Sequence, residues 1–497
     1  MRVIDTLSTD RDRSGCQWVL HHAKHQPDAV AVAGGDTYRA LAANVSRVME
    51  ALTDEGISRG QVLGVETADR YLHLLILLAA EALSVTTMSL GPSELEPPAS
   101  LGRLCDRIMV SRPDTSADSA RTTVMTVDWI TNALARPAAL ERLEAMDRAP
   151  APDFAVRLIK SSGTTGIPKV MAITHAMLWG IIRSNHLDFP PRIARCANFL
   201  CLYNFTVRAV HWRAWLALRT GGTICFTGGD ALWPAIESGP GNFVSFIAGD
   251  LARFVQSIPR DSLPRGGGPL ELRIDVSGGA VSNEARRVAR RTLTSDLNIC
   301  YGANEMQRIS RVDDDEVGTL FPEVSVKIVD DRGDAVPLGH HGTIRARSDL
   351  MVKGYIDAPE LTREAFVDGW YHTNDIGFQP SAGKLVVLGR ADDMLNAGGV
   401  KIAPGPIEER LMAIGGVRGA LVTTIDEGET SVLLAAVETG GDGDPAEQRA
   451  AVAGIASGHA TAFRTLVLAE FPRTETGKIR REHVRRLWRQ SVGAGMI

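Results

Sequence analysis

The chain has no excess of basic residues and few cysteines, and both shortages exclude classes of protein. Its 497 residues include 54 lysines and arginines but 59 aspartates and glutamates, which gives a formal net charge of −5. A nucleic-acid-binding surface normally shows a basic excess, so we expect no nucleic-acid partner. The six cysteines lack metal-type or redox-type pair spacing and are predicted to be buried, reduced thiols of a cytoplasmic protein. They stand at positions 16, 105, 196, 201, 225 and 300.

The sequence also lacks a long apolar run. The stretch Met1–Gly15 is charged and has no apolar segment, so no signal peptide is predicted. The most apolar run, Leu72–Leu83, contains Glu81 and is too short to span a bilayer. It is predicted to be a core helix, and we expect a soluble, cytoplasmic protein with no membrane span.

What the sequence does contain is an alternation of strand-like and helix-like patterns. A length of 497 residues exceeds what one hydrophobic core usually serves, so at least two domains are expected. Apolar residues recur at helical spacing from Tyr38 to Leu52. The alternation favours an α/β fold with parallel sheets covered by helices. Its strands are predicted at residues 29–33, 62–65, 223–226, 243–247 and 272–276.

From about Val317 the pattern changes to short strands separated by glycine, proline and aspartate turns. This texture predicts a small β-rich subdomain, with strands at residues 324–329, 342–346 and 384–388. The stretch Gly389–Asp393 then opens a last segment of its own.

The sharpest local signal is the stretch Lys160–Lys169, which reads KSSGTTGIPK. Its two glycines, three residues apart, allow a tight turn that exposes backbone N–H groups to an anion. Four hydroxyl side chains and Lys169 add further groups for a polyphosphate. The stretch does not match the G-x-x-x-x-G-K-[ST] loop, and a polar surface loop is the alternative interpretation.

This stretch, followed by Thr174-His175, resembles the phosphate-binding signature of the acyl-adenylate-forming superfamily, which includes acyl-CoA synthetases, peptide-synthetase adenylation domains and luciferases. Further stretches resemble the superfamily's other motifs, in its order and spacing. Tyr301–Glu305 resembles Y-G-x-T-E, Gly369–Asp375 resembles G-W-Y-x-T-G-D, and Pro472–Lys478 resembles P-R-T-x-x-G-K-I. Gly389–Asp393 and Gly398–Pro404 match a hinge and a thioester-forming loop. The resemblance extends from about Asp36 to Lys478.

The resemblance implies a fold and a set of roles. The fold is a large N-terminal domain (residues 1–388) of two α/β subdomains and a small β-subdomain, a hinge (389–393) at Asp392, and a small mobile α+β domain (394–497). Lys478, Thr165 and Glu305 would be catalytic, with Glu305 and Thr165 holding Mg²⁺. The implied nucleotide-binding residues are Ser161, Ser162, Gly163, Thr164, Thr165, Gly166, Lys169, Gly279, Tyr301, Gly302, Ala303, Asn304, Asp375, Arg390 and Lys478.

The chain departs from the superfamily pattern in four places. Val170 and Asn374 stand where glycine is usual, and Asn304 stands for threonine; asparagine tolerates a left-handed backbone, so the turn at Asn374 can survive. The fourth departure is Leu200–Arg208, which lacks the histidine of many acyl-CoA ligases. Arg208 there would repel an α-ammonium group and could favour a second anionic or polar group on the substrate. A helix-surface arginine is the equal alternative.

The acid-binding pocket is predicted to be formed by Tyr203, Asn204, Arg208, Phe246, Gly278 and Met306. The resemblance implies an enzyme that uses ATP and Mg²⁺ to join a small carboxylic acid to AMP, releases pyrophosphate, and transfers the acyl group to a thiol. CoA is the expected thiol and an acyl carrier protein the next. An amine acceptor, or activation of an inorganic anion such as nitrite, is the alternative. The sequence does not identify the acid or the oligomeric state.

Overall fold

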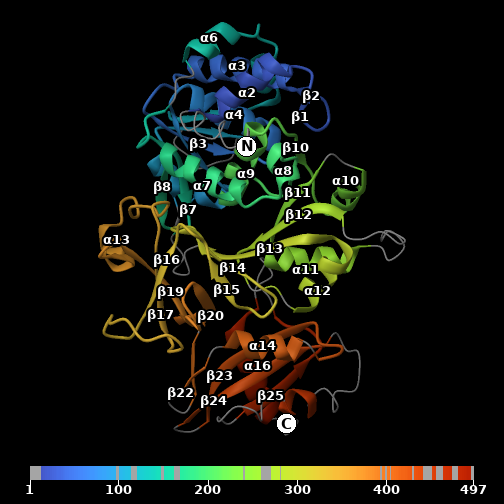
Figure 1. Ribbon diagram of the computed structural model, residues 1–497, viewed down its shortest axis with the longest axis vertical. Helices are drawn as coiled ribbons and strands as arrows, with labels where there is room; N and C mark the ends of the chain where they lie inside the picture. The colour runs from blue at the N-terminus through green and yellow to red at the C-terminus, as the bar shows by residue number, and fades with distance from the viewer. Residues whose placement is uncertain are drawn as a thin grey trace.

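The computed structural model arranges the chain as layered α/β units followed by a β-rich unit and a C-terminal unit (Figure 1). In the figure the blue and green elements lie at the top, the yellow and orange strands below them, and the red elements at the bottom. The structure describes residues 13–96, 100–112, 120–146, 150–161, 168–238, 241–258, 270–279, 281, 283–391, 394–397, 400–402, 404–412, 414–427, 430–439, 450–454, 463–472 and 479–493.

The first unit is built on a six-stranded sheet of order β6-β5-β3-β4-β7-β8. Its strand pairs are parallel except for β7 and β8, which form an antiparallel hairpin. The strands are β3 (Val62–Glu66), β4 (Thr86–Ser89), β5 (Arg107–Val110), β6 (Thr122–Val124), β7 (Ala155–Lys160) and β8 (Val170–Thr174). The helices and 3₁₀ turns of this part of the chain are α2 (Gly15–His25), α3 (Tyr38–Asp54), α4 (Arg70–Ala82), η1 (Pro92–Glu94), η2 (Leu101–Leu104), α5 (Val127–Leu134), α6 (Leu140–Met146) and α7 (His175–Leu187).

The second unit carries strands that are mostly parallel, in the order β2-β1-β10-β9-β11-β12-β13-β14. They are β1 (Val30–Val32), β2 (Asp36–Thr37), β9 (Phe199–Cys201), β10 (Ile224–Phe226), β11 (Phe243–Ile247), β12 (Leu270–Ser277), β13 (Thr294–Ala303) and β14 (Gln307–Val312). The accompanying helices are α8 (Pro191–Arg195), α9 (Arg208–Arg219), η3 (Gly229–Ala231), α10 (Leu232–Ser238), α11 (Ala248–Ser257) and α12 (Asn283–Thr292).

The β-rich unit is antiparallel and joins the second sheet through β15 and β20. It consists of β15 (Gly318–Leu320), β16 (Ser325–Val329), β17 (Gly342–Arg347), α13 (Pro359–Ala365), β18 (Phe366–Val367), β19 (Trp370–Phe378) and β20 (Lys384–Arg390). The chain leaves this sheet at Arg390, and the next strands belong to other sheets. These later elements are β21 (Leu395–Ala397), β22 (Val400–Ile402), α14 (Pro404–Met412), β23 (Gly419–Glu427), β24 (Thr430–Glu438), β25 (Phe463–Leu468) and α16 (Arg481–Gly493). The predicted hinge residue Asp392 lies outside the described residues, and the domain boundary at 388 remains a prediction.

Helix α4 forms the centre of the largest core cluster, as its apolar sequence predicts. Every residue from Leu72 to Ala82 is buried. Its one carboxylate, Glu81, accepts hydrogen bonds from the backbone N–H of Gly15 at 2.9 Å and the indole N–H of Trp215 at 3.1 Å. A buried polar group is tolerated when it is hydrogen-bonded. Within the described ranges, no helix combines the length and apolar character needed to cross a bilayer.

The predicted elements agree with those found. The eight strands and the helix from Tyr38 are present with bounds shifted by at most a few residues, and the α/β class is confirmed. The six cysteines are free, but only Cys16, Cys105 and Cys201 are buried, while Cys196, Cys225 and Cys300 are partly exposed. The expectation that all six are buried is therefore wrong for half of them.

Candidate active site

The predicted phosphate loop begins and ends on the β7–β8 hairpin. Lys160 and Val170 are paired residues of that hairpin, and the backbone N–H of Ser161 donates to the carbonyl of Lys169 at 2.9 Å. The ammonium of Lys169 lies 5.0 Å from the centre of the Tyr355 ring, within cation–π range. Ser162, Gly163, Thr164, Thr165 and Gly166 lie outside the described residues, so their predicted roles stay predictions.

Lys160 belongs to the scaffold of this loop. Its ammonium forms an ion pair with Glu94 and lies 3.4 Å from the carbonyl of Ser89. Burial lowers the pKa of Lys160, and Glu94 opposes that shift. Glu94 also accepts from the backbone N–H of Gly91 at 2.6 Å. Because Lys160 is already paired, Lys169 is the better placed cation for a polyphosphate.

Three predicted nucleotide-binding residues from distant parts of the chain meet directly. The hydroxyl of Tyr301 donates to the carboxylate of Asp375. Arg390 lies opposite Asp375 across β19 and β20, and its guanidinium is 3.6 Å from the Asp375 carboxylate. Burial and the neighbouring Asp375 raise the pKa of Tyr301 well above its usual value, so the phenol keeps its proton. We refer to Tyr301, Asp375 and Arg390 as the nucleotide cluster.

The turn at Asn374 shows how Asp375 is directed into this cluster. Asn374 has φ of +61°, the left-handed conformation that the asparagine predicts. The pairing of β17 with β19 shifts register between Arg345 and Thr343, which places Asn374 within a bulge. Bulges re-aim neighbouring side chains. The bulge is further fixed by the hydroxyl of Thr373, which accepts from the backbone N–H of Asp375 at 3.1 Å.

Glu305, the predicted metal ligand, is buried and held by a tyrosine. Tyr355 donates its hydroxyl to the Glu305 carboxylate at 2.9 Å. Burial and the Glu305 charge raise the pKa of the Tyr355 and Tyr371 phenols. The adjacent Asn304 donates its side-chain N–H to the carbonyl of Lys160 at 3.0 Å. The Tyr301–Glu305 motif is therefore attached to the end of the phosphate-loop hairpin.

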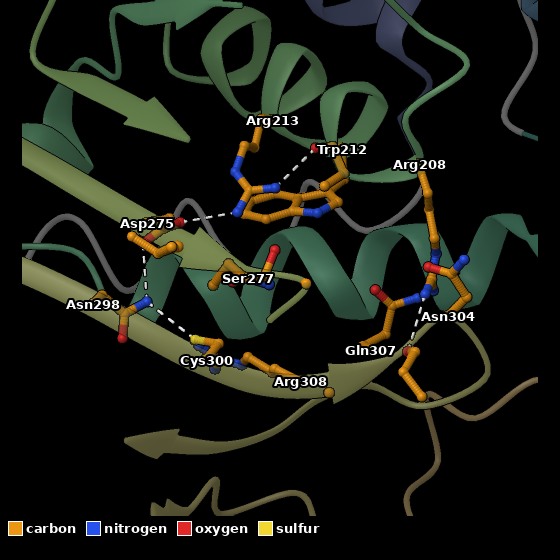
Figure 2. Close-up of a pocket in the computed structure, with 16 residues that line it drawn as sticks. Arg208, Trp212, Arg213, Asp275, Ser277, Asn298, Cys300, Asn304, Gln307 and Arg308 are labelled. Carbon is orange, nitrogen blue, oxygen red and sulfur yellow. Dashed lines mark hydrogen bonds and ion pairs between the residues drawn. The ribbon is translucent and has the colours of Figure 1, made fainter. Parts of the chain in front are cut away.

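A cavity of about 180 Å³ adjoins this motif between α9, β12 and β13. Figure 2 shows Arg208, Asn304 and Gln307 grouped on one side of it and Arg213, Asp275 and Asn298 on the other. We call it the acid cavity. It is lined by Asn185, Arg208, Ala209, Trp212, Arg213, Asp275, Val276, Ser277, Gly278, Asn298, Cys300, Gly302, Ala303, Asn304, Gln307 and Arg308.

Among the described residues that line the acid cavity, the one carboxylate is saturated by its neighbours. Asp275 pairs with Arg213 at 3.2 Å and with Arg273 at 2.9 Å, and it accepts from Asn298 at 2.9 Å. These cations keep the pKa of the buried Asp275 below its usual value although burial alone would raise it. Asp275 is therefore a fixed anion of the wall rather than a proton donor.

Arg208 is the lining cation without a carboxylate partner among the described residues. Its Nη1 donates to the carbonyl of Ala303 at 3.3 Å, and its Nη2 is buried with no hydrogen-bond acceptor in the described part of the chain. Burial lowers the pKa of Arg208 to about 9, and the Glu305 charge opposes this shift. Arg208 lines the cavity, so the alternative of a solvated helix-surface arginine is wrong.

Several other predicted acid-pocket residues lie elsewhere. Gly278 lines the acid cavity as predicted. Phe246 is instead buried in the core and stacks on Phe254 with ring centres 5.3 Å apart, while Met306 is buried in the core of the β-rich unit. Tyr203 donates to Asp250 at 2.6 Å and Asn204 donates to the carbonyl of Thr67 at 2.8 Å. These four side chains contact other groups and do not line this cavity, so their assignment to the acid pocket stays a prediction.

The remaining residues of the cavity wall were not predicted from the sequence. Trp212 and Arg213 lie four residues after Arg208 and Ala209, respectively, on α9, and that spacing is a signal from which they could have been found. Asp275, Asn298 and Gln307 carry no recognised motif. Gly279 lies beside Gly278 at the end of β12, whereas Lys478 and Asp392 fall outside the described residues.

A family model described as AMP-binding enzyme matches residues 19–356, which is more than half of the chain. The chain belongs to this family. Among proteins of assigned function, this AMP-binding enzyme is 25% identical to the fatty acid–[acyl-carrier-protein] ligase MmaC of Mycobacterium marinum, over 93% of the chain and 95% of MmaC. It is 27% identical to a salicylyl-CoA synthase / salicylate adenylyltransferase of a Streptomyces species, over 96% of each protein.

Among solved structures, the enzyme resembles o-succinylbenzoate CoA synthetase (MenE) from Bacillus subtilis in complex with its acyl-adenylate intermediate OSB-AMP. The TM-score is 0.76 at 18% identity, covering 94% of this chain and 97% of MenE. That similarity confirms the fold. With the family match and the relatives, it confirms the predicted superfamily and the predicted class, an AMP-forming acid–thiol ligase.

Proposed function

We propose that the predicted site residues carry out the two half-reactions of this AMP-forming ligase. In the first, a carboxylate oxygen of the acid attacks the α-phosphorus of ATP, the bond to pyrophosphate breaks, and an acyl-adenylate forms. In the second, a thiol displaces AMP from the acyl carbon. The single observation that carries the proposal is the direct contact among Tyr301, Asp375 and Arg390, three residues that the motifs independently assign to one nucleotide.

The nucleotide cluster is suited to a ribose and its phosphate. The Asp375 carboxylate can accept both hydroxyls of a vicinal diol, and its orientation is set by Tyr301 and by the backbone of β19. Arg390 supplies a fixed positive charge beside it. Gly302 fits a close backbone approach, because a Cβ there would collide with the backbone oxygen of Gln307.

Glu305 fits a magnesium ion shared with ATP phosphates. No group of three or more histidine, cysteine, aspartate or glutamate side chains forms a metal site in the part of the chain that the structure describes. Mg²⁺ bound to nucleotides nevertheless commonly uses only one or two carboxylates, with phosphates and water as the other ligands. Glu305, with Thr165 from the phosphate loop, would hold the ion, which would offset the negative charge of the phosphates. Tyr355 keeps the Glu305 carboxylate in place.

Acid-dependent exchange of radiolabelled pyrophosphate into ATP tests the first half-reaction. We expect exchange with the wild-type enzyme and Mg²⁺, and its loss in Glu305→Gln. Asp28→Asn is the matched control, since Asp28 is exposed and pairs only with Arg39 on the surface. Retention of full exchange by Glu305→Gln at limiting Mg²⁺ would contradict the assigned role.

The acceptor is tested separately by product analysis. The two relatives differ by name in this respect, one being a carrier-protein ligase and the other a CoA synthase. We propose CoA as the acceptor and expect acyl-CoA to accumulate on its addition. Parallel reactions contain a phosphopantetheinylated carrier protein, an amine, or nitrite with an aryl amine. If product formed in only one of these reactions, its acceptor would replace CoA in the proposal, and the proposed adenylation would stand.

A further inference from the structure

The acid cavity contains three buried hydrogen-bond donors that lack acceptors among the described residues. They are Nη2 of Arg208, Nε of Arg213 and Nε2 of Gln307, and all three residues line the cavity. Buried donors in native proteins are nearly always satisfied, by protein, water or ligand. Three donors around one small space therefore indicate a ligand or solvent rich in oxygen acceptors.

The described part of the chain does not supply those acceptors. Asp275, the one carboxylate among the described lining residues, is shared by Arg213, Arg273 and Asn298. The third lining arginine, Arg308, is satisfied by Asp188 at 3.4 Å, Glu323 at 3.3 Å and the backbone of Ser184 at 2.9 Å. The charge that remains unpaired in the described wall is that of Arg208, so the missing group is expected to be an anion.

Backbone geometry gives an independent sign that Gln307 has a role beyond packing. Gln307 adopts φ of +71°, a conformation that is unfavourable for a side chain of this kind. It begins β14 directly opposite Ala303, whose carbonyl accepts the Arg208 hydrogen bond. Left-handed residues other than glycine cluster at functional sites, where the surrounding structure holds them. The strained turn places Gln307 beside Arg208 (Figure 2).

The size of the cavity limits the ligand. The volume of the cavity is about 180 Å³. It is smaller than the roughly 300–1,000 Å³ of sites for drug-sized ligands. A short acid with a second oxygen-bearing group suits this space and the polar side chains among its lining.

We propose that the acid activated by this enzyme is a short dicarboxylic acid of about three to five carbons, whose second carboxylate is bound by Arg208 and Gln307. This inference rests on the proposed adenylation, and it assigns Arg208 and Gln307 as specificity-determining residues. The free Nε of Arg213 and the hydroxyl of Ser277 line the same space and are available to a further oxygen of the substrate. Trp212 supplies an apolar wall for the short carbon chain.

The test compares acids that differ only in the second group. Exchange of pyrophosphate into ATP is measured with malonate, succinate and glutarate, each against the monocarboxylic acid of the same length, and with succinamate, in which an amide replaces the second carboxylate. We expect kcat/KM to favour the dicarboxylic acid by about tenfold or more, with the amide between. One hydrogen-bonded charge typically contributes a preference of about 10- to 100-fold.

The variant Arg208→Met tests the assigned residue. It is expected to lower kcat/KM for the preferred dicarboxylic acid by about 10- to 100-fold and to lower kcat/KM for the matched monocarboxylic acid by a clearly smaller factor. Arg208→Lys should retain part of the preference, because charge remains but the planar fork is lost. Arg192→Met is the control, since Arg192 pairs with Glu271 at the surface. The unfolding midpoint and the affinity for ATP of each variant establish that the fold is intact.

Each outcome decides a different point. Equal kcat/KM values for monocarboxylic and dicarboxylic acids would overturn this inference. An equal loss of kcat/KM for both classes in Arg208→Met would also overturn it, because Arg208 would then be assigned to the reacting carboxylate. Nitrite supporting exchange better than any dicarboxylic acid would also overturn it. In all three cases the adenylation would stand. If exchange proceeded equally well without any added acid, it would not depend on an acid, and the proposed function on which the inference rests would be contradicted.

Discussion

The nucleotide cluster and the acid cavity are neighbours in one site, but their polar groups are satisfied in different ways. In the cluster, Tyr301, Asp375 and Arg390 bind one another before any ligand arrives. In the cavity, donors of Arg208, Arg213 and Gln307 are buried without acceptors among the described residues. We propose that the first arrangement is preorganised for the nucleotide and that the second is completed by the acid, which would make the cavity the part of the site that selects the substrate.

The comparison is tested most severely by Lys478→Ala, a change outside both groups. The motif assigns this lysine to the reacting carboxylate and the α-phosphate, where charge develops in the transition state. Loss of such a contact typically lowers the rate by about 100- to 1,000-fold. We expect that loss for every acid alike, in single-turnover measurements of pyrophosphate release. Lys384→Ala is the control, because the ammonium of Lys384 donates to the hydroxyl of Thr319 on β15 and Lys384 does not line the acid cavity. Undiminished activity would contradict the assignment.

Asp375→Ala tests the nucleotide cluster itself. Removing the carboxylate deletes the partner of both Tyr301 and Arg390 and the acceptor proposed for the ribose. Hydrogen bonds to a charged group contribute about 1.5–3 kcal/mol each, so KM for ATP should rise by about 10- to 100-fold. The rise should be the same whichever acid is present. A variant that instead changed the preference among acids would show that the cluster and the cavity are not separate.

On the cavity side, Gln307→Gly separates strain from specificity. Glycine adopts φ of +71° without penalty, so the free energy of unfolding should change little or rise by up to about 1 kcal/mol. The lost amide donor should reduce the preference for a dicarboxylic acid by about tenfold, the lower end of the contribution of a hydrogen bond to a charged group. Thermal unfolding and pyrophosphate exchange measure the two effects.

The matched control is Asp368→Gly, at a second left-handed position that is exposed and remote from the cavity. It removes a similar backbone penalty without touching the acid site. The preference among acids should therefore be unchanged in Asp368→Gly. If both variants altered the preference equally, backbone relaxation rather than the Gln307 amide would be responsible.

The same contrast between the nucleotide cluster and the acid cavity explains how much of this site could be predicted from the sequence. Tyr301, Asp375 and Arg390 sit in motifs whose spacing survives divergence, so their meeting could be anticipated from the printed sequence. Arg213 and Gln307 belong to no motif, because their positions depend on how α9 and the β13–β14 turn pack together. Phe246 does not line the acid cavity. It lies on β11, a central strand buried along most of its length, where an apolar residue near the strand end is more easily core than pocket.

The smallest effect on catalysis is expected from a third buried group, His211, which lies on α9 but does not line the acid cavity. Burial lowers its pKa well below 6.5, and the nearby Arg157 and His73 lower it further. The folded state therefore keeps His211 neutral while the unfolded state binds a proton below about pH 6.5. Stability due to this residue is present above that pH and falls by about 1.4 kcal/mol per pH unit as the pH drops below it.

The unfolding free energy of His211→Phe should therefore fall less steeply than that of the wild type between about pH 6.5 and 5, and the difference in slope should correspond to one proton. Denaturant unfolding at a series of pH values measures the slope, and His340→Phe at an exposed position is the control. The preference among acids should not change, because the His211 ring packs on Trp215 with centres 4.1 Å apart rather than facing the cavity. An altered preference would mean that burial on α9 is enough to influence the substrate, and that the unpaired donors are not what sets the choice of acid.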